Sequence, residues 1–233
     1  MTLTAFRSGR VGWRGGRGER LLAPGRYPSM LTNVVGLTLA VVGVGIFAAG
    51  VVDAIDGGPD VLVLVFTGLV IWAIGSVLWR VTIVPSQIRT LDVFTTVTLA
   101  WVAMAVAGAI PYLLTGQFTR IDDALFESIA GFTTTGATVI PDIEAASKGV
   151  LFWRSTTQLM GGMGGIVHVV AVLAPVGSGG MRLRQAEAPG PTGERLTPRV
   201  PETARRLWAV SVGRPGALAL AYALVGMSPY DAV

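Results

Sequence analysis

The chain has 233 residues, of which 52% are hydrophobic and only 14% are charged. Soluble domains carry about 25% charged residues, so this composition excludes an ordinary soluble protein and indicates that the lipid bilayer is the solvent. A net charge of +4 excludes no class of partner, whereas the lack of cysteine excludes disulfides and thiolate metal sites.

A basic segment, residues 1–28, opens the chain and has no helical apolar face. It contains six arginines, at positions Arg7, Arg10, Arg14, Arg17, Arg20 and Arg26. It has no aromatic stacking pattern beyond Trp13, and arginines with a single serine and no amphipathicity fit a transit peptide poorly. We therefore predict a cytoplasmic tail that orients the protein and binds no nucleic acid, with a misassigned start codon as the alternative.

Four long uncharged stretches follow, each of which could form a transmembrane helix of about 20 residues. They cover residues 27–52, 61–79, 93–119 and 155–181. A fifth apolar stretch, 207–227, contains Arg214 beside Pro215, which places a charge and a missing backbone donor inside that helix. We predict two N-terminal helices within residues 29–90 and a less regular fifth helix within 207–233.

The charged residues between these stretches differ in sign from one side of the membrane to the other. Arginines precede the first stretch, follow the fourth and flank the second-to-third connection at Arg80 and Arg89, which marks the cytoplasmic side. Residues 53–60 and 117–148 are mainly acidic. We therefore predict a cytoplasmic N-terminus, a cytoplasmic loop over 177–206, and acidic segments that face outward and either concentrate cations or form an ordinary solvated surface.

Residues 115–147 begin and end outside under this count. Within them, residues 121–132 show helical apolar spacing but are too few to cross a bilayer. A polar run, Gly131-Phe-Thr-Thr-Thr-Gly-Ala-Thr-Val-Ile, follows. Irregular backbone at membrane depth is tolerated only where it lines protein or a water-filled cavity. We predict a re-entrant pore helix over 121–132 and an ion filter over 133–138, with a glycine-threonine extracellular turn as the alternative.

Arg154 lies near the outer end of the fourth stretch, where a charge requires an acid or carbonyls as its partner. We predict that this partner is Glu127 on the pore helix. The pair is interpreted as a structural brace, and a gating or ion-repelling element is the alternative.

A glycine-rich run lies in the middle of the fourth stretch, at Gly161, Gly162, Gly164 and Gly165. Small residues at this spacing let transmembrane helices approach closely, and the alternative is a flexible point or a widened inner cavity. His168 stands on the same predicted helix, and we interpret it as a hydrogen-bonded interior residue, although it could titrate near neutral pH.

Several of these segments resemble the TrkH/KtrB family of potassium-uptake proteins. The resemblance is carried by Asp123-Ala-Leu-Phe-Glu-Ser-Ile-Ala-Gly-Phe-Thr-Thr-Thr-Gly-Ala-Thr-Val-Ile, Leu151-Phe-Trp-Arg-Ser-Thr-Thr-Gln and Gly161-Gly-Met-Gly. Glu187-Ala-Pro-Gly-Pro-Thr, Leu196-Thr-Pro-Arg and Glu202-Thr-Ala-Arg-Arg-Leu-Trp are similar to the TrkH branch in particular.

This resemblance implies an all-α integral membrane protein with potassium-channel-like units. The chain would hold two extra N-terminal helices, one complete membrane-pore-membrane unit over 91–176 and the first helix of a second unit, so that it supplies one quarter of the filter. The location would be the bacterial plasma (inner) membrane. A homodimer and a cytosolic nucleotide-binding regulatory subunit are the implied protein partners, and no organic cofactor is implied.

The same resemblance assigns roles within the filter. The backbone carbonyls of Thr134 and Thr135 would contact potassium, and Gly136 would be the filter glycine. Ala137 and Thr138 would complete the loop, with side chains that anchor it or, as the alternative, touch the ion. Thr133 would belong to the same filter segment. No catalytic pair or metal-ligand cluster stands out, so we do not expect an enzyme. The alternative function is a truncated, non-conducting membrane fragment that only associates with full-length subunits.

Overall fold

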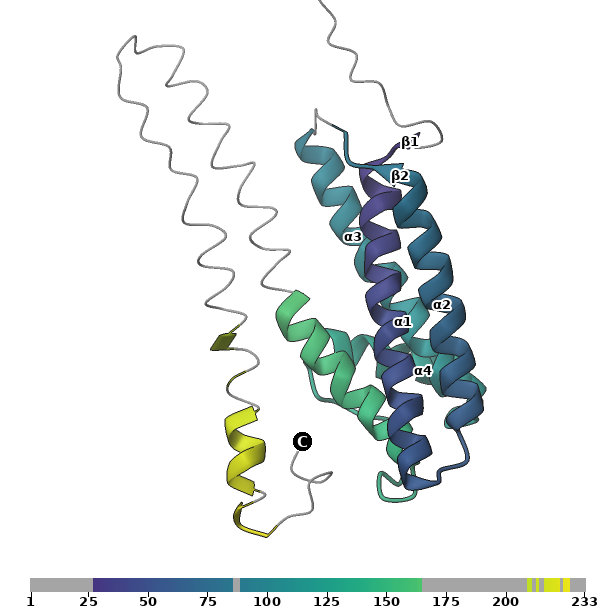
Figure 1. Ribbon diagram of the computed structural model, residues 1–233, viewed down its shortest axis with the longest axis vertical. Helices are drawn as coiled ribbons and strands as arrows, with labels where there is room; N and C mark the ends of the chain where they lie inside the picture. Colours follow the sequence, from purple (N-terminus) through teal and green to yellow (C-terminus); the bar gives the residue numbers. More distant parts are fainter. Residues whose placement is uncertain are drawn as a thin grey trace, which may run out of the picture.

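The computed structural model describes residues 27–85 and 89–164, together with residues 209–210, 213, 216–222 and 224–226 (Figure 1). The predicted tail up to Arg26, the predicted loop over 177–206, Gly165 and His168 lie outside the described residues. Of the predicted fifth helix, residues 216–222 are described as helical.

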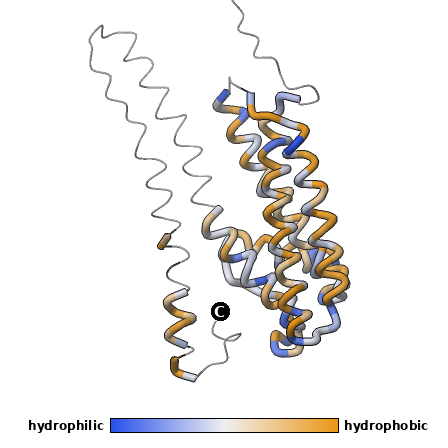
Figure 2. The backbone as a smooth tube through the Cα atoms, in the orientation of Figure 1, coloured by the Kyte–Doolittle hydropathy of each residue, from blue (hydrophilic) through white to orange (hydrophobic). Residues whose placement is uncertain are grey.

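Three helices in the described part of the chain are long and apolar enough to cross a membrane. They are α1 (Met30–Asp56), α2 (Val61–Val81) and α3 (Thr90–Leu114). Figure 2 shows hydrophobic residues along their length and hydrophilic residues gathered near their ends. These helices confirm the first three predicted spans. The fourth is described only up to residue 164, and residues 148–164 form a helix.

Helices α1 and α2 form an antiparallel pair whose backbones approach closely through glycines (Figure 1). A Cβ built on Gly43 would lie 2.4 Å from the Trp72 backbone nitrogen, and one on Gly75 would lie 2.3 Å from that of Ala40. No larger side chain fits such a contact, so these glycines fix the distance between the helices. This glycine-lined contact between α1 and α2, the glycine seam, was not predicted from the sequence.

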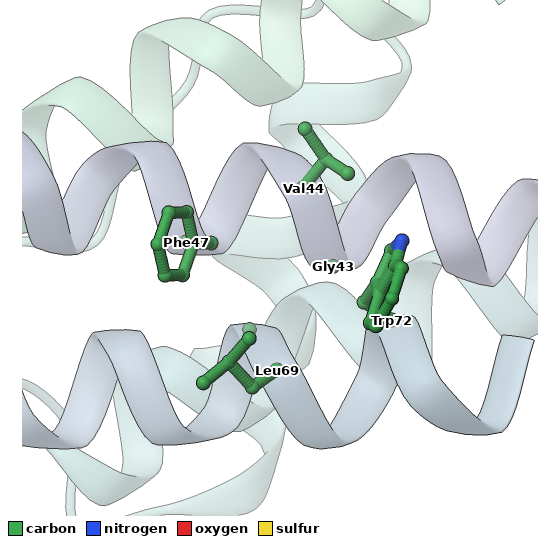
Figure 3. Close-up of a pocket in the computed structure, with 6 residues that line it drawn as sticks. Gly43, Val44, Phe47, Leu69 and Trp72 are labelled. Carbon is green, nitrogen blue, oxygen red and sulfur yellow. The ribbon is translucent and has the colours of Figure 1, made fainter. Parts of the chain in front are cut away.

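Two glycines of the pair, Gly43 and Gly68, line an apolar groove of about 170 Å³ (Figure 3). Val44 and Phe47 of α1 and Leu69 and Trp72 of α2 surround it, and all four side chains are exposed in the structure. An exposed apolar surface of this kind is what a helix pair presents to lipid.

A short parallel pairing holds one end of the α1–α2 pair together. Strand β1 (Tyr27–Pro28) pairs with β2 (Thr82–Ile83). The Asn33 amide reinforces this pairing by donating to the Thr82 carbonyl at 3.0 Å. The uncharged stretch begins at Tyr27, and α1 begins at Met30, within the predicted range 29–90, where the Ser29 side chain accepts a hydrogen bond from the Thr32 amide.

The remaining helices pack on α1 and α3 and surround the loop over 133–140. Helix α4 (Ile121–Phe132) lies against α3, and the helix over 148–164 lies against α1 and α4 (Figure 1). Trp153 is fully buried at this junction, where its Nε1 donates to the Gly108 carbonyl of α3 at 3.1 Å. Its ring meets that of Phe132 edge-on, with centroids 6.2 Å apart.

The two ends of the helical bundle differ in charge as the sequence predicts. Asp53, Asp56 and Asp60 lie at the end where α1 and α2 are joined, and Lys148 pairs with Asp56 there at 2.5 Å. Arg80 and Arg89 lie at the opposite end, beside the β1–β2 pairing. The three aspartates and the two arginines therefore lie at opposite ends of the helical bundle.

Candidate functional site

The candidate site begins with α4, whose bounds, Ile121–Phe132, are those of the short helix predicted from the sequence. Asp122 and Asp123 lie in its first turn, where negative charge complements the helix dipole. The hydrogen bond from Arg120 holds the pKa of the Asp122 carboxyl below its usual range. The C-terminal end of α4, with its partial negative charge, opens directly into the candidate filter.

The apolar residues whose spacing predicted α4 are, as a set, only partly buried. Ile121 and Ile129 are exposed, whereas the buried residues are mostly small or polar, namely Ala124, Glu127, Ser128, Ala130, Gly131 and Phe132. Small side chains allow close approach, and Ser128 donates to the Ala105 carbonyl of α3 at 2.8 Å. An apolar residue in a membrane protein need not face the protein interior, so apolar periodicity located the helix but not its packing face.

Residues 133–140 form an irregular loop with exposed side chains from Thr133 to Val139. The amides of Thr133, Thr134 and Thr135 return to the last carbonyls of α4, at distances of 2.8–3.0 Å. Two residues of the loop have left-handed backbones, Thr134 with φ of 56° and Gly136 with φ of 75°. Such angles are open to glycine but uncommon for a β-branched residue. Nothing in the sequence signals the conformation of Thr134.

Glu127 holds this loop from behind. Its side chain is only 1% exposed, and one carboxylate oxygen accepts from the Thr138 hydroxyl and from the Val139 amide, each at 3.0 Å. The other oxygen accepts from Arg154 Nε at 2.7 Å. The expected anchoring by the Thr138 side chain is present in this arrangement.

Arg154 joins the ion pair to the loop. Besides binding Glu127, its guanidinium donates to the Gly136 carbonyl at 3.2 Å. The carboxylate is the partner that the sequence predicts for this arginine, whereas the contact with Gly136 was not foreseen. Brace and gate remain alternative interpretations of the pair.

The carbonyls of the loop therefore fall into two groups. The Gly136 carbonyl is occupied by Arg154, while those of Thr134 and Thr135 accept no hydrogen bond from any residue between 27 and 164 that the structure describes. Free carbonyl oxygens on an exposed loop can replace the water around a dehydrated cation. The assignment of these two carbonyls to potassium stays a prediction.

The glycine-rich run packs directly behind the loop. A Cβ on Gly161 would lie 1.9 Å from the Phe132 carbonyl oxygen, whereas one on Gly162 would lie 3.8 Å from the Thr134 side chain. Gly131 of α4 likewise faces Thr157, because a Cβ on Gly131 would lie 2.2 Å from the Thr157 hydroxyl oxygen. Gly161 thus serves close packing, which is the first of the two interpretations given above. The packing role of Thr157 was not predicted from the sequence. Its position within the segment Leu151–Gln158, which carries the family resemblance, was the only sign of it.

Side-chain metal sites of the usual kind use clusters of histidine and carboxylate groups. In the part of the chain that the structure describes, no group of three or more histidine, aspartate or glutamate side chains is placed to hold a metal ion. A site built from backbone carbonyls belongs to a different class, which selects hard cations through oxygen dipoles.

Comparison with known proteins agrees with this geometry. The family model described as "TrkH: Cation transport protein" matches residues 62–230. The Trk system potassium uptake protein TrkH of Vibrio parahaemolyticus is 37% identical over 210 residues, covering 87% of this chain and 42% of that protein. The potassium uptake protein TrkG of Escherichia coli is 37% identical over 177 residues, covering 75% of this chain and 36% of TrkG.

A solved structure shares the fold. The crystal structure of the potassium transporter TrkH from Vibrio parahaemolyticus matches with a TM-score of 0.70 and 33% identity, over 87% of this chain and 40% of the other. The chain thus spans about two fifths of the length of the Vibrio parahaemolyticus protein.

Proposed function

The chain belongs to the TrkH family of cation transport proteins, and from this premise we propose that it is part of a potassium uptake protein in which residues 133–138 supply one quarter of the selectivity filter. The family is one of transporters and not of enzymes. The names of the relatives support potassium as the transported ion, because the Vibrio and Escherichia proteins are described as potassium uptake proteins.

One observation carries the proposal. Among the described residues, none donates a hydrogen bond to the carbonyls of Thr134 and Thr135, while Arg154 and Glu127 bind Gly136, Thr138 and Val139. A filter has to present oxygen dipoles at fixed positions, because an ion gives up water only when several carbonyls replace it at comparable energy. The ion pair of Glu127 and Arg154 supplies that fixation through its bonds to Gly136, Thr138 and Val139.

The arrangement of helices supports the finer assignment of units. Helices α3 and α4, the loop and the helix over 148–164 form the first membrane-pore-membrane unit, which we place over 91–176. Helices α1 and α2 are the two extra N-terminal spans, and residues 207–233 begin a second unit. Four such units would surround one pathway, with the N-terminus in the cytoplasm of a bacterium and a multi-pass chain in its plasma membrane.

The partners rest on the resemblance. A second transport subunit would form a homodimer, and a cytosolic nucleotide-binding regulatory subunit would bind the cytoplasmic face. The competing hypothesis is a non-conducting fragment that only associates with full-length subunits, which the following experiment separates from a working filter.

The experiment joins this chain to the part of Vibrio parahaemolyticus TrkH that follows the matched region, in a bacterium lacking potassium uptake. Growth at low potassium and rubidium uptake are measured for the joined protein and for two variants. Gly136→Ala places a side chain at the filter, and Gly116→Ala is the matched control. Both glycines have φ of 75° and open space where a Cβ would stand, so the local strain is equal.

We expect the joined protein to restore growth, Gly136→Ala to reduce uptake at least tenfold, and Gly116→Ala to retain it. A joined protein that fails to transport while the intact Vibrio protein succeeds would contradict the proposal. Equal uptake by the two variants would also contradict it, because the loop would then not be the filter.

A further inference from the structure

We propose that Asp53 is a positioning residue for the filter, through which the N-terminal helix pair fixes the orientation of the helix that carries Arg154. This inference rests on the proposed function, because it assigns to α1 and α2 a role in the site although neither belongs to the pore unit. It concerns a buried carboxylate that the filter itself does not use.

Asp53 joins the beginnings of two helices. It is the only charged residue of α1 that is fully buried, and its carboxylate accepts from the Asp60 amide at 2.9 Å and from the Gly149 amide at 3.0 Å. The first amide precedes α2 and the second lies in the opening turn of the helix over 148–164. A carboxylate is favoured there because free N–H groups and the helix dipole make a helix start electropositive.

The backbone around Asp53 leaves room for nothing larger than its carboxylate. A Cβ on Gly58 would lie 2.3 Å from the Asp53 Oδ1 atom, and one on Gly149 would lie 2.7 Å from the Asp53 Cβ. Glycines on both sides therefore let two backbone segments close on one side chain. Lys148 and Asp56 add an ion pair beside it, but both side chains are 42% exposed, and exposed pairs contribute little.

The contact at Gly149 reaches the filter through a short, well-packed piece of helix. Arg154 follows five residues later, about 7.5 Å along the helix axis. Trp153, the residue before it, is fully buried and lies against α1, where a Cβ on Gly45 would be 3.0 Å from its ring. A turn or shift of this segment at Gly149 therefore moves the arginine as well.

Arg154 tolerates little displacement. Its bonds to Glu127 at 2.7 Å and to the Gly136 carbonyl at 3.2 Å depend on distance and angle, and the second is already long for an N–H···O bond. Movement of the arginine would release the Gly136 carbonyl and the carboxylate that holds Thr138 and Val139. Asp53 itself bonds none of the loop residues, so its effect on the filter is transmitted through the helix that carries Arg154.

A purely local role is the competing explanation, in which Asp53 merely stabilises the α1–α2 turn. Hydrogen exchange of the purified 233-residue protein in lipid nanodiscs distinguishes the two, since it reports local opening residue by residue. The reporters are the bonded amides of the loop, at Thr133, Thr134, Thr135 and Val139. The test variant is Asp53→Asn, and Asp60→Asn is the control, because no hydrogen bond or ion pair of the Asp60 side chain is present among the described residues.

We expect Asp53→Asn to speed exchange about tenfold at Val139 and at the threonine amides, and Asp60→Asn to leave them unchanged. Faster exchange confined to residues 53–61 and 148–150 would overturn the inference. If Asp53→Asn does not fold, Gly149→Ala decides the matter, because its new Cβ presses on Asp53 from the other helix and should loosen the same loop amides.

A transport measurement gives the second readout. In the joined protein, Asp53→Asn should lower the preference for potassium over sodium at least fivefold per folded molecule at the membrane, while Asp60→Asn keeps it. Unchanged selectivity beside reduced protein amount would overturn a positioning role. If the joined protein does not transport at all, the proposed function fails, but the exchange experiment still tests whether Asp53 positions the loop.

Discussion

The ion pair of Glu127 and Arg154 binds the filter loop through two side chains. Glu127 accepts hydrogen bonds from Thr138 and Val139, and Arg154 donates one to the Gly136 carbonyl. The carboxylate is 1% exposed and the guanidinium 20%. Removing one partner therefore leaves the other charge without its partner and with little access to water. Breaking such a buried pair costs about 3–5 kcal/mol, whereas replacing both partners is often nearly neutral.

We therefore expect Glu127→Gln to lower the stability of the purified protein by about 3 kcal/mol, and the double variant Glu127→Gln, Arg154→Gln to lower it by less. Unfolding in detergent micelles measures both. The exposed pair of Arg120 and Asp122 gives the control, since Asp122→Asn should cause no measurable change. A double variant less stable than Glu127→Gln would contradict this account of the pair.

The left-handed backbone of Thr134 leads to a second prediction about stability. Its φ of 56° places a β-branched side chain in the left-handed region, at a cost of about 1–2 kcal/mol. Thr134→Gly should raise the stability by up to about 1 kcal/mol, because relief of strain exceeds the added freedom of the unfolded chain. Thr133→Gly should lower it, since Thr133 has an ordinary φ of −81° and its hydroxyl donates to the Ile129 carbonyl. The same unfolding measurement applies, and a loss of stability in both variants would exclude strain at Thr134.

At the scale of the elements, glycines determine how closely the helices approach. Gly161 and Gly162 are neighbours on the helix over 148–164, yet they face different surroundings. A Cβ on the first would meet the backbone of Phe132 at 1.9 Å, and one on the second would make only an ordinary contact at 3.8 Å. The helix cannot accept the first without moving away from α4.

Gly161→Ala should therefore destabilise the protein by about 2 kcal/mol or more, in the range known for overpacked interiors. Gly162→Ala should leave stability unchanged or raise it by up to about 1 kcal/mol, because alanine favours helix. Unfolding of the two variants, with exchange at the Thr135 amide as a local probe, provides the comparison. Similar effects from both would mean that the run acts as a flexible point and does not serve packing.

Local patterns in the sequence predict which segments of this chain form helices, but not how those helices pack. The three spans and the bounds of α4 could be predicted, because uncharged length and apolar spacing are local properties. The partner of Arg154 could be predicted because a charge in the membrane demands an acid. The β1–β2 pairing, the glycine seam of α1 and α2, and the buried face of α4 could not, because each depends on which residues of a distant segment lie opposite.

The role of Asp53 belongs with these non-local features. Its sequence neighbours mark it as one of several acids in an outward-facing segment, and it shares that description with Asp56 and Asp60. Only the fold distinguishes them, by burying Asp53 against Gly149, which lies 96 residues further along the chain. Burial and not composition therefore separates a positioning residue from a solvated one.

At the scale of the whole molecule, one candidate filter loop lies within the described residues, between α4 and the helix over 148–164. A potassium site of carbonyl oxygens needs several loops around one axis. Copies of this chain could provide them only if α1, which packs against Trp153, and its partner α2 also fitted around a symmetric pore. We expect that they do not, because the helix pair covers one flank of the unit.

The last prediction follows from this geometry. In a bacterium lacking potassium uptake, the 233-residue chain alone should not restore growth at low potassium, whereas the chain joined to the remainder of Vibrio parahaemolyticus TrkH should. Membrane content of each protein is measured alongside, so that poor expression is not mistaken for inactivity. Restored growth by the chain alone, lost in Gly136→Ala but kept in Gly116→Ala, would mean that repeated copies assemble a filter and that α1 and α2 fit around it.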